Sequence, residues 1–156
     1  MNGWGAIADG QGLLRARDAA RLGLTSRDLA HLVASGDLVR LERGWYSLPL
    51  PVLEPDVDTV WERRRRLHAA KARAMVRAHD GRAVASHYSA LVLTGLPAFA
   101  ADLRQVHLTR VIGTQSRRRA GLTIHRAAPG AIWSDGAIAL PSLSLARRPP
   151  TARWPA

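Results

Sequence analysis

The sequence has no cysteine and only one lysine, Lys71, among its 156 residues. The missing thiols exclude a disulfide framework, a cysteine nucleophile and every cysteine-based zinc or iron–sulfur site. No stretch approaches the ~18 consecutive apolar residues that a membrane span needs. Charged residues interrupt the first 24 positions, so they do not form the apolar run of a signal peptide. We expect a soluble, cytoplasmic protein with no membrane partner.

The usual signatures of catalysis are also missing. There is no glycine-rich phosphate loop, and a nuclease constellation of acids and a lysine cannot form after Lys71. Ser86 and His87 are adjacent, but a catalytic serine needs a base that faces it and a third group that orients the base. His107 and His125 could lie on neighbouring strands, but core or surface roles are far more common for such residues than metal binding. We therefore predict no enzymatic activity, no cofactor and no metal.

Positive charge is abundant and unevenly distributed. The chain has 23 basic and 12 acidic residues, a net charge of +11, and 22 of the cations are arginine. The net charge is +1 over residues 1–50, +2 over 51–80 and +8 over 81–156. Arginine matches phosphates and guanine edges well. This excess favours a polyanionic partner, with nucleic acid as the leading candidate.

Proline marks the predicted divisions of the chain. Pro49, Pro51 and Pro55 fall within seven residues and favour an extended linker. A second proline-rich run occupies the last ten residues, which we expect to be a disordered tail. The predicted domains are residues 1–50, 51–146 and the tail 147–156.

Helical patterns fill the first part of the chain. Short helices are expected over 4–11 and 15–22, the second with Ala16, Ala19 and Ala20 facing inward and Gly23 ending it. Thr25 and Asp28 have the spacing of a capping box at the start of a third helix, over 26–35. That helix carries Leu29, Leu32 and Val33 on one face. Two helices joined by a short glycine turn are typical of a helix-turn-helix.

Two short strands follow these helices. Residues 38–41 and 45–47 flank the turn Glu42-Arg43-Gly44 and predict a β-hairpin. A helix-turn-helix followed by a hairpin is a winged helix, whose third helix enters a major groove while the hairpin flanks it. The candidate DNA-contacting residues here are Arg15, Arg17, Ser26, Arg27, His31, Arg40 and Arg43. Such units also serve as protein-docking modules, and this one is nearly neutral, so that alternative stays open.

A long helix is predicted over 55–79, with Pro55 at its first position. It contains four consecutive arginines, 63–66. Successive helix positions are ~100° apart, so these side chains cannot all face one groove. We interpret them as a solvated face, with Glu62 pairing with Arg66 four residues later.

In the basic second half, apolar and polar residues alternate as in the strands of a small sheet. A strand over 83–85 precedes a helix that Ser86 caps, and strands are expected over 104–109 and 122–126. Arg117, Arg118 and Arg119 are expected at or near a hairpin tip, where a flexible loop would let several of them reach one phosphate strand. Pairing with an acidic protein partner is the alternative.

Two groups of residues together resemble a known family. The first is Gly23-Leu24-Thr25-x3-Leu29-x2-Leu32-Val33-x2-Gly36-x-Leu38-x2-Leu41-x-Arg43-Gly44-x-Tyr46. The second comprises Ser86-His87-x-Ser89-Ala90, Val106-His107-Leu108-Thr109 and Gly121 to Arg126. Over residues 4–146 the chain resembles the AbiEi antitoxins of type IV toxin–antitoxin, or abortive-infection, systems. Residues 139–146 are similar to the start of the family's next helix.

The resemblance implies a transcriptional repressor that binds operator repeats in double-stranded DNA of its own operon. It also implies a nucleotidyltransferase-like toxin that the antitoxin counters, with or without tight binding. The expected fold is α+β: an N-terminal winged helix-turn-helix, then a long helix and a small mixed α/β C-terminal region. The alternative function is a protein-interaction module, either a truncated antitoxin or a remnant of a nuclease-like protein, that docks an acidic protein partner.

Overall fold

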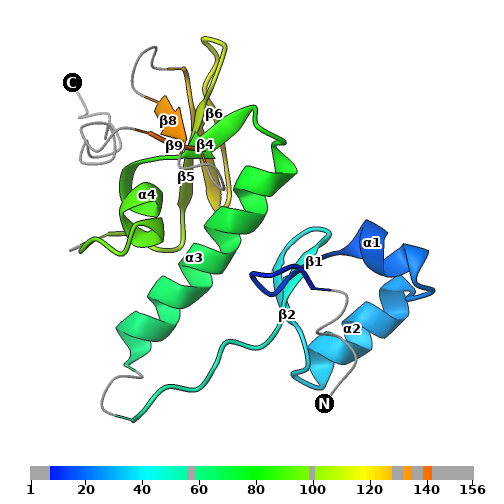
Figure 1. The fold of residues 1–156 in the computed structure, drawn as a ribbon. Coiled ribbons are helices and arrows are strands. Elements are labelled where there is room, and N and C mark those ends of the chain that lie inside the picture. The colour runs from blue at the N-terminus through cyan, green and yellow to red at the C-terminus, as the bar shows by residue number, and fades with distance from the viewer. Residues whose placement is uncertain (1–7, 56–58, 99–100, 128–131, 135–138, 142–156) are drawn as a thin grey trace. The chain divides into compact units, whose positions relative to one another are not determined.

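A computed structural model describes residues 8–55, 59–98, 101–127, 132–134 and 139–141 (Figure 1). The chain divides into two compact units, Met1–Ala74 and Met75–Ala156, with the boundary inside the long helix α3 (Val60–Ala78). Helices and strands are mixed along both units, which confirms the predicted α+β class. Among the described helices, none is both long and apolar enough to cross a membrane.

The first unit contains a winged helix-turn-helix. Its elements are β1 (Leu13–Arg15), α1 (Ala16–Arg21), α2 (Ser26–Ala34), β2 (Val39–Glu42) and β3 (Trp45–Ser47). The strands form an antiparallel sheet in the order β1-β3-β2. The hairpin β2–β3 is therefore the predicted wing, and β1 completes its sheet from the other side.

The turn between α1 and α2 follows from one glycine. Gly23 has φ of +85°, a conformation that a side chain disfavours, and it ends α1 as predicted. The N–H of Leu24 donates to the carbonyl of Ala19, and the N–H of Gly23 donates to that of Ala20. This pair of bonds is the Schellman motif, which satisfies carbonyls at the end of α1 and turns the chain toward α2.

α2 begins with the capping box that the sequence predicts. The N–H of Thr25 donates to the Asp28 carboxylate at 2.8 Å, and the N–H of Asp28 donates to the Thr25 hydroxyl at 3.2 Å. Below the helix, a buried cluster joins both helices to β1 and the start of the wing; it consists of Leu14, Ala19, Leu29 and Leu38. Ala16 packs partly against this cluster, whereas Ala20 is exposed, so its predicted inward position is wrong.

The start of the chain differs from expectation. Residues 1–7 lie outside the described residues, and 8–12 form turns rather than the second half of a helix over 4–11. Leu13 to Arg15 then form a strand, β1, that was not predicted. Its three residues pair with Ser47, Tyr46 and Trp45 of β3. A strand this short carries too little periodicity to be recognised before its partner is known.

The long helix is shorter at its N-terminal end than predicted. α3 begins at Val60, where the Thr59 hydroxyl accepts the N–H of Glu62, and Pro55 lies in a turn before it. Glu62 pairs with Arg65, at 3.5 Å, rather than with Arg66. Arg66 instead donates a hydrogen bond to the carbonyl of Pro51.

The second unit contains a four-stranded mixed sheet. Its strands are β4 (Ala83–Ala85), β5 (Val106–Arg110), β6 (Arg117–Arg119) and β7 (Leu122–His125), in the order β4-β5-β7-β6. β5 and β7 are parallel, while β4 and β6 run antiparallel to their neighbours. Helix α4 (His87–Leu93) packs beside β4 and β5 (Figure 1).

Two further strands, β8 (Ile132–Ser134) and β9 (Ala139–Pro141), form an antiparallel pair. The helical start expected at 139–146 is therefore wrong over its first three residues. The remaining residues of that segment, and the predicted tail 147–156, lie outside the described residues.

Candidate nucleic-acid interface

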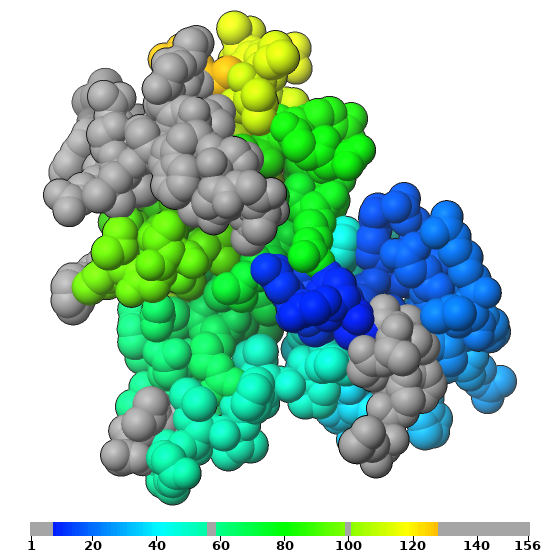
Figure 2. All heavy atoms as spheres, viewed as in Figure 1, coloured from blue at the N-terminus to red at the C-terminus, as the bar shows by residue number. Residues whose placement is uncertain are grey.

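The outer face of α2 is polar and exposed. Leu29 is buried on the inner face, while Ser26, Arg27 and His31 are exposed. Arg27 and His31 are four residues apart, so they lie one above the other on the same side of the helix. Both helices lie at the surface of the unit (blue in Figure 2). This arrangement leaves α2 with side chains that can donate hydrogen bonds to a bound partner.

Asp28 puts a negative charge beside these residues, but the capping box engages it. The Thr25 hydroxyl and then the Thr25 N–H donate to this carboxylate. Both bonds hold the pKa of Asp28 below its ordinary value of 3.8, so the group is ionised at neutral pH. Its oxygens are directed to the helix start, and the neighbouring Arg27 and His31 carry the donors of the exposed face.

The wing presents two arginines. Arg40 is exposed on β2, and Arg43 is exposed in the two-residue turn between β2 and β3. Gly44, the second turn residue, has φ of +74°, which permits a turn this tight. Arg43 therefore lies at the tip of the hairpin, as the sequence predicts.

The arginines near α1 have partners within the unit. The Arg15 guanidinium lies over the ring of Trp45, 4.8 Å from its centroid. Arg17 lies 3.7 Å from the Asp18 carboxylate, which also accepts a hydrogen bond from Arg21 at 3.1 Å. Sequence reasoning missed the contact with Trp45, because it depends on the unpredicted pairing of β1 with β3.

Arg117, Arg118 and Arg119 lie next to a hairpin turn, as predicted, but they belong to a strand and not to a flexible loop. They form β6, the exposed edge strand, and pair with Ile124, Thr123 and Leu122 of β7. The hairpin turn is limited to the next two residues, 120 and 121. Since side chains alternate along a strand, Arg117 and Arg119 share one face and Arg118 lies on the other.

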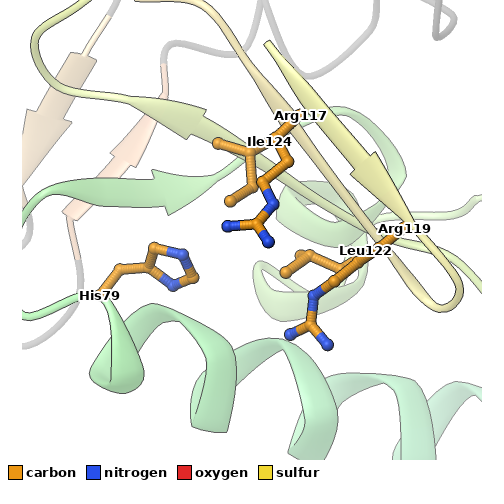
Figure 3. Close-up of a pocket in the computed structure, with 5 residues that line it drawn as sticks. All are labelled: His79, Arg117, Arg119, Leu122 and Ile124. Atoms are coloured by element: carbon orange, nitrogen blue, oxygen red, sulfur yellow. The ribbon is translucent and has the colours of Figure 1, made fainter. Parts of the chain in front are cut away.

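Arg117 and Arg119 line a pocket of about 280 Å³ together with His79, Leu122 and Ile124. Figure 3 shows both guanidinium groups and the His79 ring projecting into the same space. The Nδ1–H of His79 donates to the carbonyl of Met75 at 2.7 Å, which fixes the ring at the end of α3. Two guanidinium groups in one pocket suit an anion with several oxygens, such as a phosphate.

The N-terminal architecture is a helix-turn-helix with a β wing, which is typical of DNA-binding regulators. Residues 6–49 match the AbiEi_4 family model, described as transcriptional regulator, AbiEi antitoxin. The resemblance recognised from the sequence is thus confirmed for this N-terminal region. No curated protein matches the chain.

Proposed function

We propose that the chain is a DNA-binding autorepressor and the antitoxin of a type IV toxin–antitoxin system. Residues 1–50 form the DNA-binding domain, 51–146 add the long helix and the basic region, and the toxin is a nucleotidyltransferase-like protein of the same operon. The observation that carries the proposal is the exposed face of α2, with Arg27 and His31, on a winged helix that matches regulators of this family.

The proposed contacts are of two kinds: contacts to base edges, which recognise the DNA sequence, and contacts to phosphates, which position the protein on the duplex. Ser26, Arg27 and His31 read base edges in a major groove, while Arg40 and Arg43 of the wing contact phosphates beside it. Arg15 and Arg17 add phosphate contacts near the start of α1. In the second unit, Arg117 and Arg119 hold a backbone phosphate in the pocket with His79, and Arg118 contributes from the other face of β6.

A second candidate function is docking to an acidic protein. It is favoured by the near-neutral charge of residues 1–50 and by the pairing of Arg17 and Arg21 with Asp18. In that case the excess arginines of the second half would meet carboxylates rather than phosphates. Such a module would show no preference among DNA sequences.

Binding of the full chain to its own promoter distinguishes the two functions. Fluorescence anisotropy with a duplex from upstream of the gene, against a scrambled duplex, should show tighter binding to the promoter. The logarithm of affinity should fall linearly with the logarithm of salt concentration, by ~0.9 per neutralised phosphate. Equal affinity for both duplexes, or no binding at low salt, would reject the repressor.

A further inference from the structure

Three histidines that are distant in the sequence meet in the second unit. His87 begins α4, His107 lies on β5 and His125 ends β7. One ring nitrogen of each lies within 4.8 Å of the other two. His107 Nδ1 and His125 Nε2 are 3.0 Å apart, and the ring centroids of His87 and His125 are 4.2 Å apart.

The sheet explains why His107 and His125 face each other. In the parallel pair β5–β7, His107 is opposite Thr123 and Thr109 is opposite His125. An offset of two residues returns to the same face of a sheet, so both imidazoles project from one side. This proximity depends on the parallel register, because a slip of one residue would send the two rings to opposite faces.

The start of α4 is fixed onto β5 at the same point. The N–H of Ser86 donates to the carbonyl of His107 at 2.9 Å, and the N–H of His107 donates to the Ser89 hydroxyl at 2.9 Å. His87, between these two serines, has φ of +51°, a left-handed conformation that is unfavourable for a residue with a side chain. Residues are held in such conformations when the surroundings enforce them, often at binding sites.

The cluster is also largely buried. His87 and His107 are each 6% exposed. The 3.0 Å contact between His107 Nδ1 and His125 Nε2 requires one of these two nitrogens to accept, so at least one of them offers a lone pair. Neutral imidazole is the form that coordinates metal ions.

We propose that His87, His107 and His125 bind one divalent transition-metal ion of the zinc class, with water as the fourth ligand. Imidazole suits Zn²⁺, Cu²⁺ and Ni²⁺ rather than Mg²⁺ or Ca²⁺, which prefer oxygen ligands. Tetrahedral Zn²⁺ with Zn–N bonds of 2.0–2.1 Å places its ligand nitrogens about 3.4 Å apart. The 3.0 Å pair therefore opens by a few tenths of an ångström, and the third nitrogen moves inward.

Two hydroxyl groups have the positions of supporting residues. Ser86 Oγ lies 3.1 Å from His87 Nδ1, where it can accept the Nδ1–H and leave the lone pair on Nε2. Thr109 is 1% exposed, and its Oγ1 has no hydrogen-bond partner. It shares a face with His107 and is opposite His125 in the register. A buried hydroxyl without a partner is costly, and a metal-bound water would satisfy it.

The test is metal titration of the full chain after treatment with a chelator. Calorimetry with Zn²⁺ should give one ion per chain, and Co²⁺ should produce the visible absorption of a four-coordinate site. H125N removes a partly exposed ligand and should lower the Zn²⁺ affinity more than 100-fold. S86A, which frees the His87 ring, should lower it by about 10–100-fold. H31N removes one exposed imidazole from the first unit and should leave the affinity unchanged.

Histidine side-chain NMR of the wild-type chain gives a second result that does not depend on any variant folding. On addition of Zn²⁺ the ring nitrogens of His87, His107 and His125 should shift together, while those of His31 and His79 should not. Absence of binding at micromolar Zn²⁺, or undiminished binding by folded H125N, would show that the cluster is only a packed, hydrogen-bonded core. Shifts confined to other histidines would overturn the assignment as well.

Discussion

Arg15 of β1 lies over the ring of Trp45, its register partner on β3, with the guanidinium carbon 4.8 Å from the ring centroid. Trp45 is largely buried, at 7% exposed, so Arg15 covers one side of an aromatic residue in the wing sheet. An arginine over a tryptophan face is stabilised by the ring quadrupole. The contact connects the strand before the helices to the strand that ends the wing.

R15A should therefore destabilise the winged helix as well as weaken any phosphate contact. We expect the free energy of unfolding to fall by about 1 kcal/mol in chemical denaturation. R17A is the matched control, because Arg17 pairs only across the surface with Asp18 and its loss should cost less than ~0.5 kcal/mol. Equal effects of the two variants would mean that the stacking adds no stability.

Arg27 is the test of sequence reading. R27A should reduce the preference for promoter over scrambled DNA by about 1–3 kcal/mol, because a base-edge contact is lost. R21A removes the same charge from the exposed end of α1 and should leave the preference intact. The measurement is the ratio of dissociation constants for the two duplexes at one salt concentration. An equal loss of affinity for both duplexes would mean that Arg27 contacts the DNA phosphate backbone and not a base edge.

The alternation along β6 separates its three arginines. The double variant R117A/R119A removes both guanidinium groups from one face of β6. It should reduce the slope of log affinity against log salt concentration by about 1.8, or ~0.9 for each phosphate contact. R118A, on the opposite face of the same strand, should change the slope by less than half as much. The binding curves are repeated over a series of salt concentrations. If R118A has the larger effect, the pocket with His79 is not the phosphate site.

The capping box predicts a pH dependence. The pKa of Asp28 is lowered in the folded chain, so its contribution to stability is present above the unfolded value of 3.8 and is lost as the pH falls through the folded value. D28N should lower the melting temperature at pH 7, and its difference from wild type should shrink in acid. Thermal unfolding followed by circular dichroism at pH 7 and pH 3 measures this. If the difference in melting temperature were the same at both pH values, the charge of the Asp28 carboxylate would not contribute to the stability of the cap.

Local signals in the sequence were sufficient for most elements of the first unit. The capping box at Thr25, the glycine stop at Gly23 and the turn at Gly44 each act within a few residues, so α1, α2 and the wing were predicted close to their observed bounds. The helix predicted over 4–11 was wrong in its described part. β1 was missed because a strand of three residues can be recognised only by its pairing, and its partner, β3, is some thirty residues away in the sequence.

The second unit shows the same limit more strongly. β4, β5 and β7 were located, but β6, β8 and β9 were not. The arginines of β6 were expected at or near a hairpin tip with a flexible loop, and they form a pairing strand beside the turn. His107 and His125 were placed on neighbouring strands, which is correct, but the approach of His87 to both was missed. The members of this cluster are separated by 20 and 18 positions, and no helical or strand period connects them. The adjacent Ser86 and His87, just after β4, were the one local feature that pointed to this site.

The sequence by itself determined the charge of the chain, the absence of thiol chemistry and the helix-turn-helix with its wing, because these depend on composition or on contacts between near neighbours. Tertiary structure alone decided which arginines share a face, that β5 and β7 run parallel and that three histidines meet. Those outcomes depend on the relative stability of alternative strand pairings between distant segments, and no short-range pattern encodes them.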